Sequence, residues 1–253
     1  MTELYLYLNQ SLPEGLDPQR LAGLAGLVVE AGCLSVREAS ALPAPVAALC
    51  VRLRATHGQV PSADAQVDWD WDADTAPACV VDAGLDACAA LRDAQPERNW
   101  LPRLTVYPQE VSYRMANYSG EGFKFFTPDP ASIHIYRVTD GDRRLIPTLR
   151  RARDLGFERI WLHARDAERR GRGLDLDLLE RARAEYPEGL WLSGGATEAR
   201  HLENLSREGG ADGVVIGLDL LQAVGVEALL AALAPPPPEV SATWTPRSDH
   251  AAV

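Results

Sequence analysis

The sequence predicts an α/β protein, more specifically a (β/α)8 barrel with a divergent N-terminal half. From residue 132 onward, short apolar segments alternate with amphipathic segments of helical length. Such alternation is typical of right-handed βαβ units with a parallel sheet. The 253 residues, 46% of them hydrophobic, suffice for one large core, and α/β barrels reach about 250 residues as a single domain. The strand candidates number eight, which would close a TIM barrel.

Four of the expected strands lie in the regular C-terminal half, at residues 132–138, 159–163, 189–193 and 213–216. The other four are less regular and lie at residues 4–8, 46–53, 79–82 and 103–107. An open, doubly wound sheet is the structural alternative, because it uses the same βαβ units.

Helices are expected between these strands. Asp17 and Pro18 fit an N-cap followed by proline at the first helical position. Apolar residues between positions 21 and 29 have helical spacing, and Gly32 could end that helix. Later helices are expected at residues 85–92, 145–155, 176–186, 198–207 and 226–233.

The remaining segments are irregular. Residues 55–77 are polar and form either a long loop or a strand, and the aromatic segment 111–130 is expected to be a functional or disordered loop. Residues 1–234 are expected to form the barrel domain. Residues 235–253 open with a run of prolines and are expected to be a disordered tail.

Composition excludes several classes of function. The net charge of −11 argues against nucleic acids and anionic membranes as partners. No signal peptide or membrane span is evident, so a cytoplasmic location is expected, and a homo-oligomer is compatible with the sequence. The four cysteines form no CxxC pair, and no HExxH, GxGxxG or P-loop pattern occurs, so neither a metal nor a cofactor is expected.

Glycine-rich corners follow the last two expected strands. In a barrel, the loops after strands seven and eight frequently bind phosphate. Glycines allow close backbone approach, and amide N–H groups with a helix N-terminus stabilise a dianion without lysine. The alternative is that these glycines only form tight turns. The expected phosphate-binding residues are Ser193, Gly194, Gly195, Ala196, Gly217 and Leu218.

Residues 144–222 resemble the ribulose-phosphate-binding barrels of histidine biosynthesis, nearest to the phosphoribosylformimino-aminoimidazole carboxamide ribotide isomerases. The resemblance is carried by RIWLHARDAERRGRGLDLDLL at residues 159–179, by Ser193-Gly194-Gly195 and by the strand 213–217. It implies a barrel fold, phosphate at both glycine corners and an isomerase activity. Those isomerases carry an aspartate at the end of the first strand, where this chain has Asn9.

An isomerase of this type needs a general acid and a general base near the substrate. His163 ends an expected strand, although a hydrogen-bonded core histidine is the alternative. Asp82 also ends a strand and could instead cap a turn. Asp166 and Glu168 lie in an arginine-rich loop, where a solvated ion-pair network is the alternative.

Lys124 is the chain's only lysine and lies between aromatic residues, in GFKFF. A lysine with apolar neighbours can form a Schiff base, as in an aldolase. The sequence thus leaves three hypotheses: an isomerase or lyase acting on a small phosphorylated metabolite, a catalytically silent barrel that binds such a ligand, and a Schiff-base aldolase or synthase using Lys124.

Overall fold

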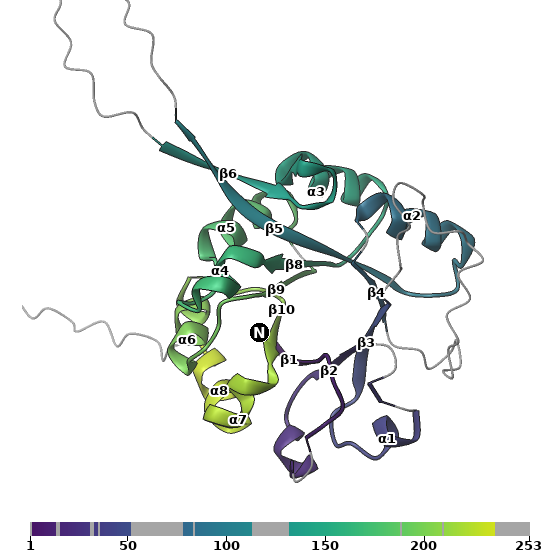
Figure 1. Ribbon diagram of the computed structural model, residues 1–253, viewed down its shortest axis with the longest axis vertical. Helices are drawn as coiled ribbons and strands as arrows, with labels where there is room; N and C mark the ends of the chain where they lie inside the picture. The colour runs from purple at the N-terminus through teal and green to yellow at the C-terminus, as the bar shows by residue number, and fades with distance from the viewer. Residues whose placement is uncertain are drawn as a thin grey trace, which may run out of the picture.

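The computed structural model describes residues 2–13, 16–30, 33–34, 36–51, 78–82, 84–112, 132–187, 189–208 and 210–235. Its centre is a closed barrel of eight parallel strands, because β1 pairs with both β2 and β10, and β4 pairs with β5. Figure 1 shows these strands around a ring with helices outside it. In barrel order they are β1 (Glu3–Leu8), β2 (Gly26–Glu30), β3 (Val46–Val51), β4 (Ala78–Val81), β5 (Trp100–Ser112), β8 (Ile160–Ala164), β9 (Leu190–Ser193) and β10 (Gly213–Gly217).

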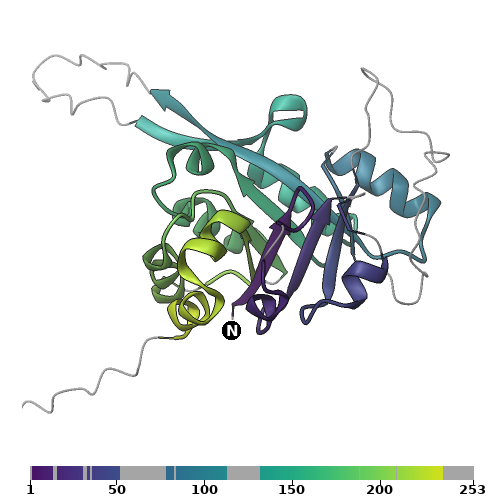
Figure 2. The ribbon, with the colours of Figure 1, turned by 60° about the horizontal axis from the view of Figure 1, so that its bottom comes forward.

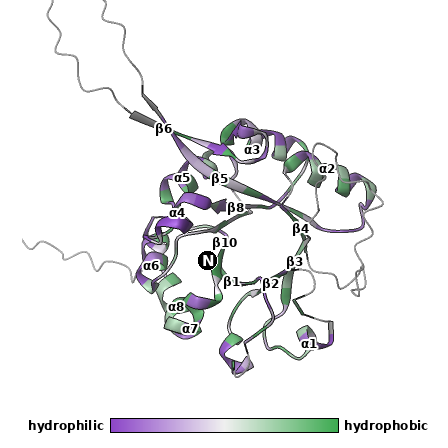
Figure 3. Ribbon diagram, viewed as in Figure 1, coloured by the Kyte–Doolittle hydropathy of each residue, from purple (hydrophilic) through white to green (hydrophobic). Residues whose placement is uncertain are grey.

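The helices lie outside the ring of strands, and most of them carry both hydrophilic and hydrophobic residues (Figure 3). They are α1 (Val36–Ser40), α2 (Leu85–Ala94), α3 (Leu145–Asp154), α4 (Arg165–Arg170), α5 (Leu176–Glu185), α6 (Ala199–Arg207), α7 (Leu218–Val224) and α8 (Val226–Leu233). Two short 3-10 helices, η1 (Pro18–Leu21) and η2 (Asp140–Asp142), and the two-residue strand β7 (Arg143–Arg144) complete the described elements.

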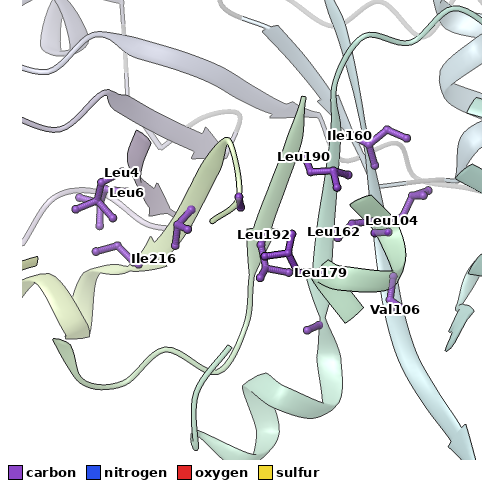
Figure 4. Close-up of a cluster of buried hydrophobic side chains, with 14 of the residues drawn as sticks. Leu4, Leu6, Leu104, Val106, Ile160, Leu162, Leu179, Leu190, Leu192 and Ile216 are labelled. Carbon is purple, nitrogen blue, oxygen red and sulfur yellow. The ribbon is translucent and has the colours of Figure 1, made fainter. Parts of the chain in front are cut away.

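Alternation along each strand separates two cores. In β1, Leu4 and Leu6 belong to the large cluster between sheet and helices, whereas Tyr5 belongs to a separate cluster inside the barrel. This follows from the two-residue period of a strand, which sends neighbouring side chains to opposite faces. Figure 4 shows the outer cluster, in which leucines of neighbouring strands lie side by side.

Aromatic side chains fill the barrel interior from one side. The rings of Tyr5 and Trp191 stack at 4.1 Å between centroids, and Tyr7 meets Trp161 edge-on at 5.8 Å. Strands β2 to β4 contribute smaller residues to the same cluster, namely Val28, Ala48, Cys50, Ala78 and Val80. Large and small residues therefore share the limited volume inside the ring.

The helix expected over residues 21–29 is wrong, and a strand takes its place. Asp17 does cap a short helix, accepting a hydrogen bond from the Gln19 backbone, but that helix ends at Leu21. Residues Gly26–Glu30 form β2, and all five are buried. A short, continuous apolar run that is buried on both faces has no periodicity to separate strand from helix.

The segment 132–138 is a strand, but it is not a member of the barrel. This strand, β6 (Ser132–Val138), pairs antiparallel with the outer part of β5, from Val106 to Ser112. Figure 2 shows the two strands leaving the barrel as a ribbon. The alternating sequence SIHIYRV is typical of an antiparallel strand with one exposed face, whereas buried parallel strands are almost continuously apolar. The fifth barrel strand is the first part of β5.

The other expected strands and helices are confirmed to within a few residues where the structure describes them. The segment 55–77, the aromatic residues 113–130 with Lys124, and the tail after Pro235 lie outside the described residues. None of the helices in the described ranges has the length and hydropathy that a bilayer span requires.

Two glycines on β10 provide a matched test of the packing. A methyl group on Gly213 would lie 2.7 Å from the Trp191 ring and 2.9 Å from the Tyr5 ring, whereas one on Gly217 would meet nothing within 4 Å. We expect Gly213→Ala to lower the free energy of unfolding by about 1–3 kcal/mol through overpacking. Gly217→Ala should leave it nearly unchanged. Urea unfolding of both variants measures this, and equal losses would contradict the packing.

Candidate functional site

A cavity of about 400 Å³ opens at the carboxyl ends of the barrel strands. Active sites of β/α-barrels lie at this end, because the loops after the strands converge there. The cavity brings together side chains from β1, β5, β8, β9 and β10 and from the segments that follow them. Its lining includes Tyr7, Arg103, Trp161, His163, Glu168, Ser193, Gly194, Gly195, Ala196, Thr197, Gly217 and Asp219.

Both predicted glycine corners line this cavity. Ser193, Gly194, Gly195 and Ala196 belong to the corner after β9, and Gly217 ends β10, the next strand around the barrel. Leu218 is not part of the lining, although it begins α7, directly after Gly217.

The two glycines after β9 are required by packing. Gly194 and Gly195 have φ angles of 100° and 95°, which side chains rarely tolerate. A methyl group on Gly195 would lie 2.1 Å from the Gly173 carbonyl oxygen, and one on Gly194 would lie 2.5 Å from that of Ala164. The Gly173 N–H also donates to the Gly195 carbonyl at 2.9 Å. The tight-turn explanation therefore accounts for both glycines, whatever else their amides bind.

Gly217 differs from them in every respect. Its φ is −82°, it is exposed, and a methyl group there would have no neighbour within 4 Å. It is the N-cap residue of α7 and supplies no side-chain cap to that helix. The first amides of a helix have no intrahelical acceptor. Gly217, with no neighbour at its Cβ position, and the uncapped N-terminus of α7 both line the same cavity.

His163 lies at the end of β8 and is 8% exposed. Its Nδ1 is 3.0 Å from the Ser193 Oγ, and its Nε2 is 3.1 Å from a carboxylate oxygen of Glu168. Burial and the nearby Arg103 guanidinium lower the pKa of His163, and the carboxylates of Glu168 and Asp82 oppose this only in part. The imidazole is therefore neutral near pH 7.

Arg103 contributes a cationic side chain to the cavity lining. Its guanidinium lies 4.5 Å from the centre of the Trp161 ring and 5.7 Å from that of Tyr7. It also pairs with Asp82 at 3.2 Å. Asp82 does not line the cavity. Its carboxylate, which acts on His163 through its charge, is paired with Arg103.

Asp166, among the remaining sequence candidates, does not line the cavity. It pairs with Arg169 at 2.8 Å and with Arg165 at 3.6 Å, as the ion-pair alternative expects. Lys124 lies outside the described residues. Of the five candidates for catalysis, the structure places His163 and Glu168 in the cavity.

Sequence reasoning missed several cavity residues, among them Tyr7, Arg103, Trp161 and Asp219. The first three share a signal, since each is a large or charged residue at an inward position of a barrel strand. Recognising them requires knowing which residues of each strand point into the barrel. The alternating sequence of β1 indicates this, whereas the continuous apolar runs of other strands do not. Asp219 lies in α7, a helix that the sequence did not indicate.

Within the described ranges, no group of three or more histidine, cysteine or acidic side chains is placed to hold a metal ion. Compared with models of protein families and with curated proteins, the chain matches none of them.

The lowered pKa of His163 makes folding pH-dependent. As pH falls below about 6.5, the unfolded chain takes up this proton while the folded protein does not, so stability decreases. We expect His163→Gln to lose less free energy of unfolding between pH 7.5 and 5.5 than the wild type, since it lacks this proton. Urea titrations at several pH values measure the difference, and parallel curves for the two proteins would contradict the assignment.

Proposed function

We propose that this barrel binds a small phosphorylated metabolite at the carboxyl ends of its strands and isomerises it by proton transfer through His163 and Glu168. The observation that carries the proposal is the shared cavity: both glycine corners and the His163–Glu168 pair line one space of about 400 Å³.

The phosphate part of the proposal is supported by the position of α7. The short helix follows the eighth barrel strand, where extra helices of β/α-barrels frequently bind phosphate with their N-termini. The amides of Gly195 and Ala196 on one corner and of Gly217 on the other are the proposed ligands from the cavity lining, and the amide of Leu218, directly after Gly217 at the start of α7, is proposed to join them. Backbone donors of this kind suit a chain whose net charge is −11.

The acid/base part is supported by the environment of His163. The Glu168 carboxylate can accept a proton from carbon while a neutral imidazole donates a hydrogen bond to a substrate oxygen, and the lowered pKa of His163 keeps its imidazole neutral near pH 7. Glu168, whose side chain is 60% exposed, lies within hydrogen-bond distance of Nε2. Asp219 adds a second carboxylate to the lining and is a candidate partner for substrate hydroxyl groups.

A catalytically silent binding barrel is the second candidate, and one observation favours it. The resembling isomerases carry an acid at the end of the first strand, whereas this chain has the exposed Asn9 there, outside the cavity lining. Tyr7 is the only contribution of β1 to that lining.

Substitution of Gly217 tests the phosphate site. Gly217→Asp should fold normally, because φ is ordinary and the space is open, and aspartate is a favourable N-cap. Its carboxylate would take the α7 amides and repel a dianion, so we expect loss of inorganic phosphate binding. Gly217→Ala is the control and should bind almost normally. Calorimetry and anion-soaked crystals measure both; undiminished binding by Gly217→Asp would place phosphate elsewhere.

Replacing His163 separates catalysis from binding. In a panel of sugar phosphates and aminosugar phosphates, we expect the wild type to interconvert at least one aldose–ketose pair. His163→Gln should lower kcat by about 10²–10⁴-fold while its affinity for inorganic phosphate stays unchanged. Solvent-deuterium exchange into the substrate, followed by NMR, measures the proton transfer. Phosphate binding without turnover by the wild type across the panel would support the silent barrel instead.

A further inference from the structure

A chain of hydrogen bonds connects the barrel core to the cavity. The Trp161 indole Nε1 donates to the Ser193 Oγ at 2.7 Å, and that oxygen lies 3.0 Å from the Nδ1 of His163. The opposite nitrogen, Nε2, lies 3.1 Å from the Glu168 carboxylate. Trp161, His163 and Ser193 are 1%, 8% and 6% exposed, so water competes little for the first two contacts.

The groups at the two ends of this chain, the Trp161 indole and the Glu168 carboxylate, determine where the protons of Ser193 and His163 lie. An indole N–H can only donate and an ionised carboxylate can only accept. Ser193 therefore receives a hydrogen bond from Trp161 and keeps its own proton to donate. A neutral imidazole has one N–H, and the Glu168 contact is a hydrogen bond only when that proton is on Nε2.

The alternative tautomer fails at both ends. With the proton on Nδ1, Ser193 would accept from both Trp161 and His163, and its own buried hydroxyl proton would lose the Nδ1 acceptor. The lone pair of Nε2 would also face a carboxylate oxygen at 3.1 Å. A buried donor without a partner is unfavourable, so the Nε2–H tautomer is strongly favoured.

We propose that Ser193, oriented by Trp161, is a positioning residue that holds His163 in the Nε2–H tautomer and so directs its exchangeable proton to the cavity beside Glu168. Ser193 then occupies Nδ1, so the Nε2–H faces a ligand only as a hydrogen-bond donor, and the Glu168 carboxylate is left as the proton acceptor. This catalytic consequence rests on the proposed function, whereas the tautomer itself does not.

Nitrogen NMR of the full chain, labelled with ¹⁵N-histidine, tests the tautomer without any ligand. His163→Gln identifies the His163 signals among those of the five histidines. In the wild type near pH 7 we expect a pyridine-type Nδ1 and a pyrrole-type Nε2. A pyrrole-type Nδ1 in the wild type would overturn the proposal outright, whether or not the chain binds phosphate.

Two substitutions test which residues determine the tautomer of His163. Ser193→Ala removes the donor to Nδ1, and Trp161→Phe removes the indole N–H while keeping an aromatic ring. We expect both to shift the His163 signals toward a mixture of tautomers, Ser193→Ala more strongly. Wild-type signals in Ser193→Ala would show that Glu168 alone sets the tautomer and would overturn the role of Ser193. If one variant fails to fold, the spectra of the other variant and of the wild type still show whether the neighbours of Nδ1 determine the tautomer.

A kinetic test applies once a substrate of the wild type is known. Ser193→Ala should lower kcat by about tenfold or more, because an orienting group that fixes the tautomer acts on the chemical step. KM should change little, and phosphate binding should remain. Covalent labelling of Ser193 in the wild type by a fluorophosphonate would assign it a nucleophilic role and overturn the positioning role.

Discussion

Closure of the sheet between β1 and β10 is the constraint on which the site depends. The pairing runs from Glu3 with Gly213 to Tyr7 with Gly217, and it places the first strand of the chain beside the last. Parallel strands in a closed ring must all end at the same rim. Tyr7, His163, Ser193 and Gly217 meet there although as many as 210 residues of sequence separate the first from the last.

The charges at this rim differ from those of an anion site that is lined by lysine side chains. Arg103 is paired with Asp82 and lies against two aromatic rings, so its charge is partly neutralised. Glu168 and Asp219 add negative charge to the cavity lining. In the proposed phosphate site, an anion would therefore depend on the main-chain amides of the two glycine corners. The acidic residues would confine its position further by repelling it elsewhere.

Much of this arrangement was predictable from sequence because the C-terminal half is locally consistent. Apolar strands, amphipathic helices and glycine corners all indicate the same units in β8, β9 and β10, and the predicted corners do share a cavity with His163 and Glu168. The N-terminal half was harder, since β2 is a buried run whose period is ambiguous. The eight-strand count survived because the omission of β2 was offset by the inclusion of β6, which lies outside the ring. Contacts such as Trp161 with Ser193 depend on register across the sheet, which no local pattern contains.

The 13-residue strand β5 belongs to two kinds of pairing at once. Its first part pairs in parallel with β4 and β8, and its outer part pairs antiparallel with β6. Insertion of one residue before Arg103 would turn the guanidinium from the interior to the helix side and shift the whole outer ribbon with it. Length variation in this strand is therefore tolerable only beyond Val106, where the parallel partners have ended. The ribbon can change over evolution while the rim stays intact.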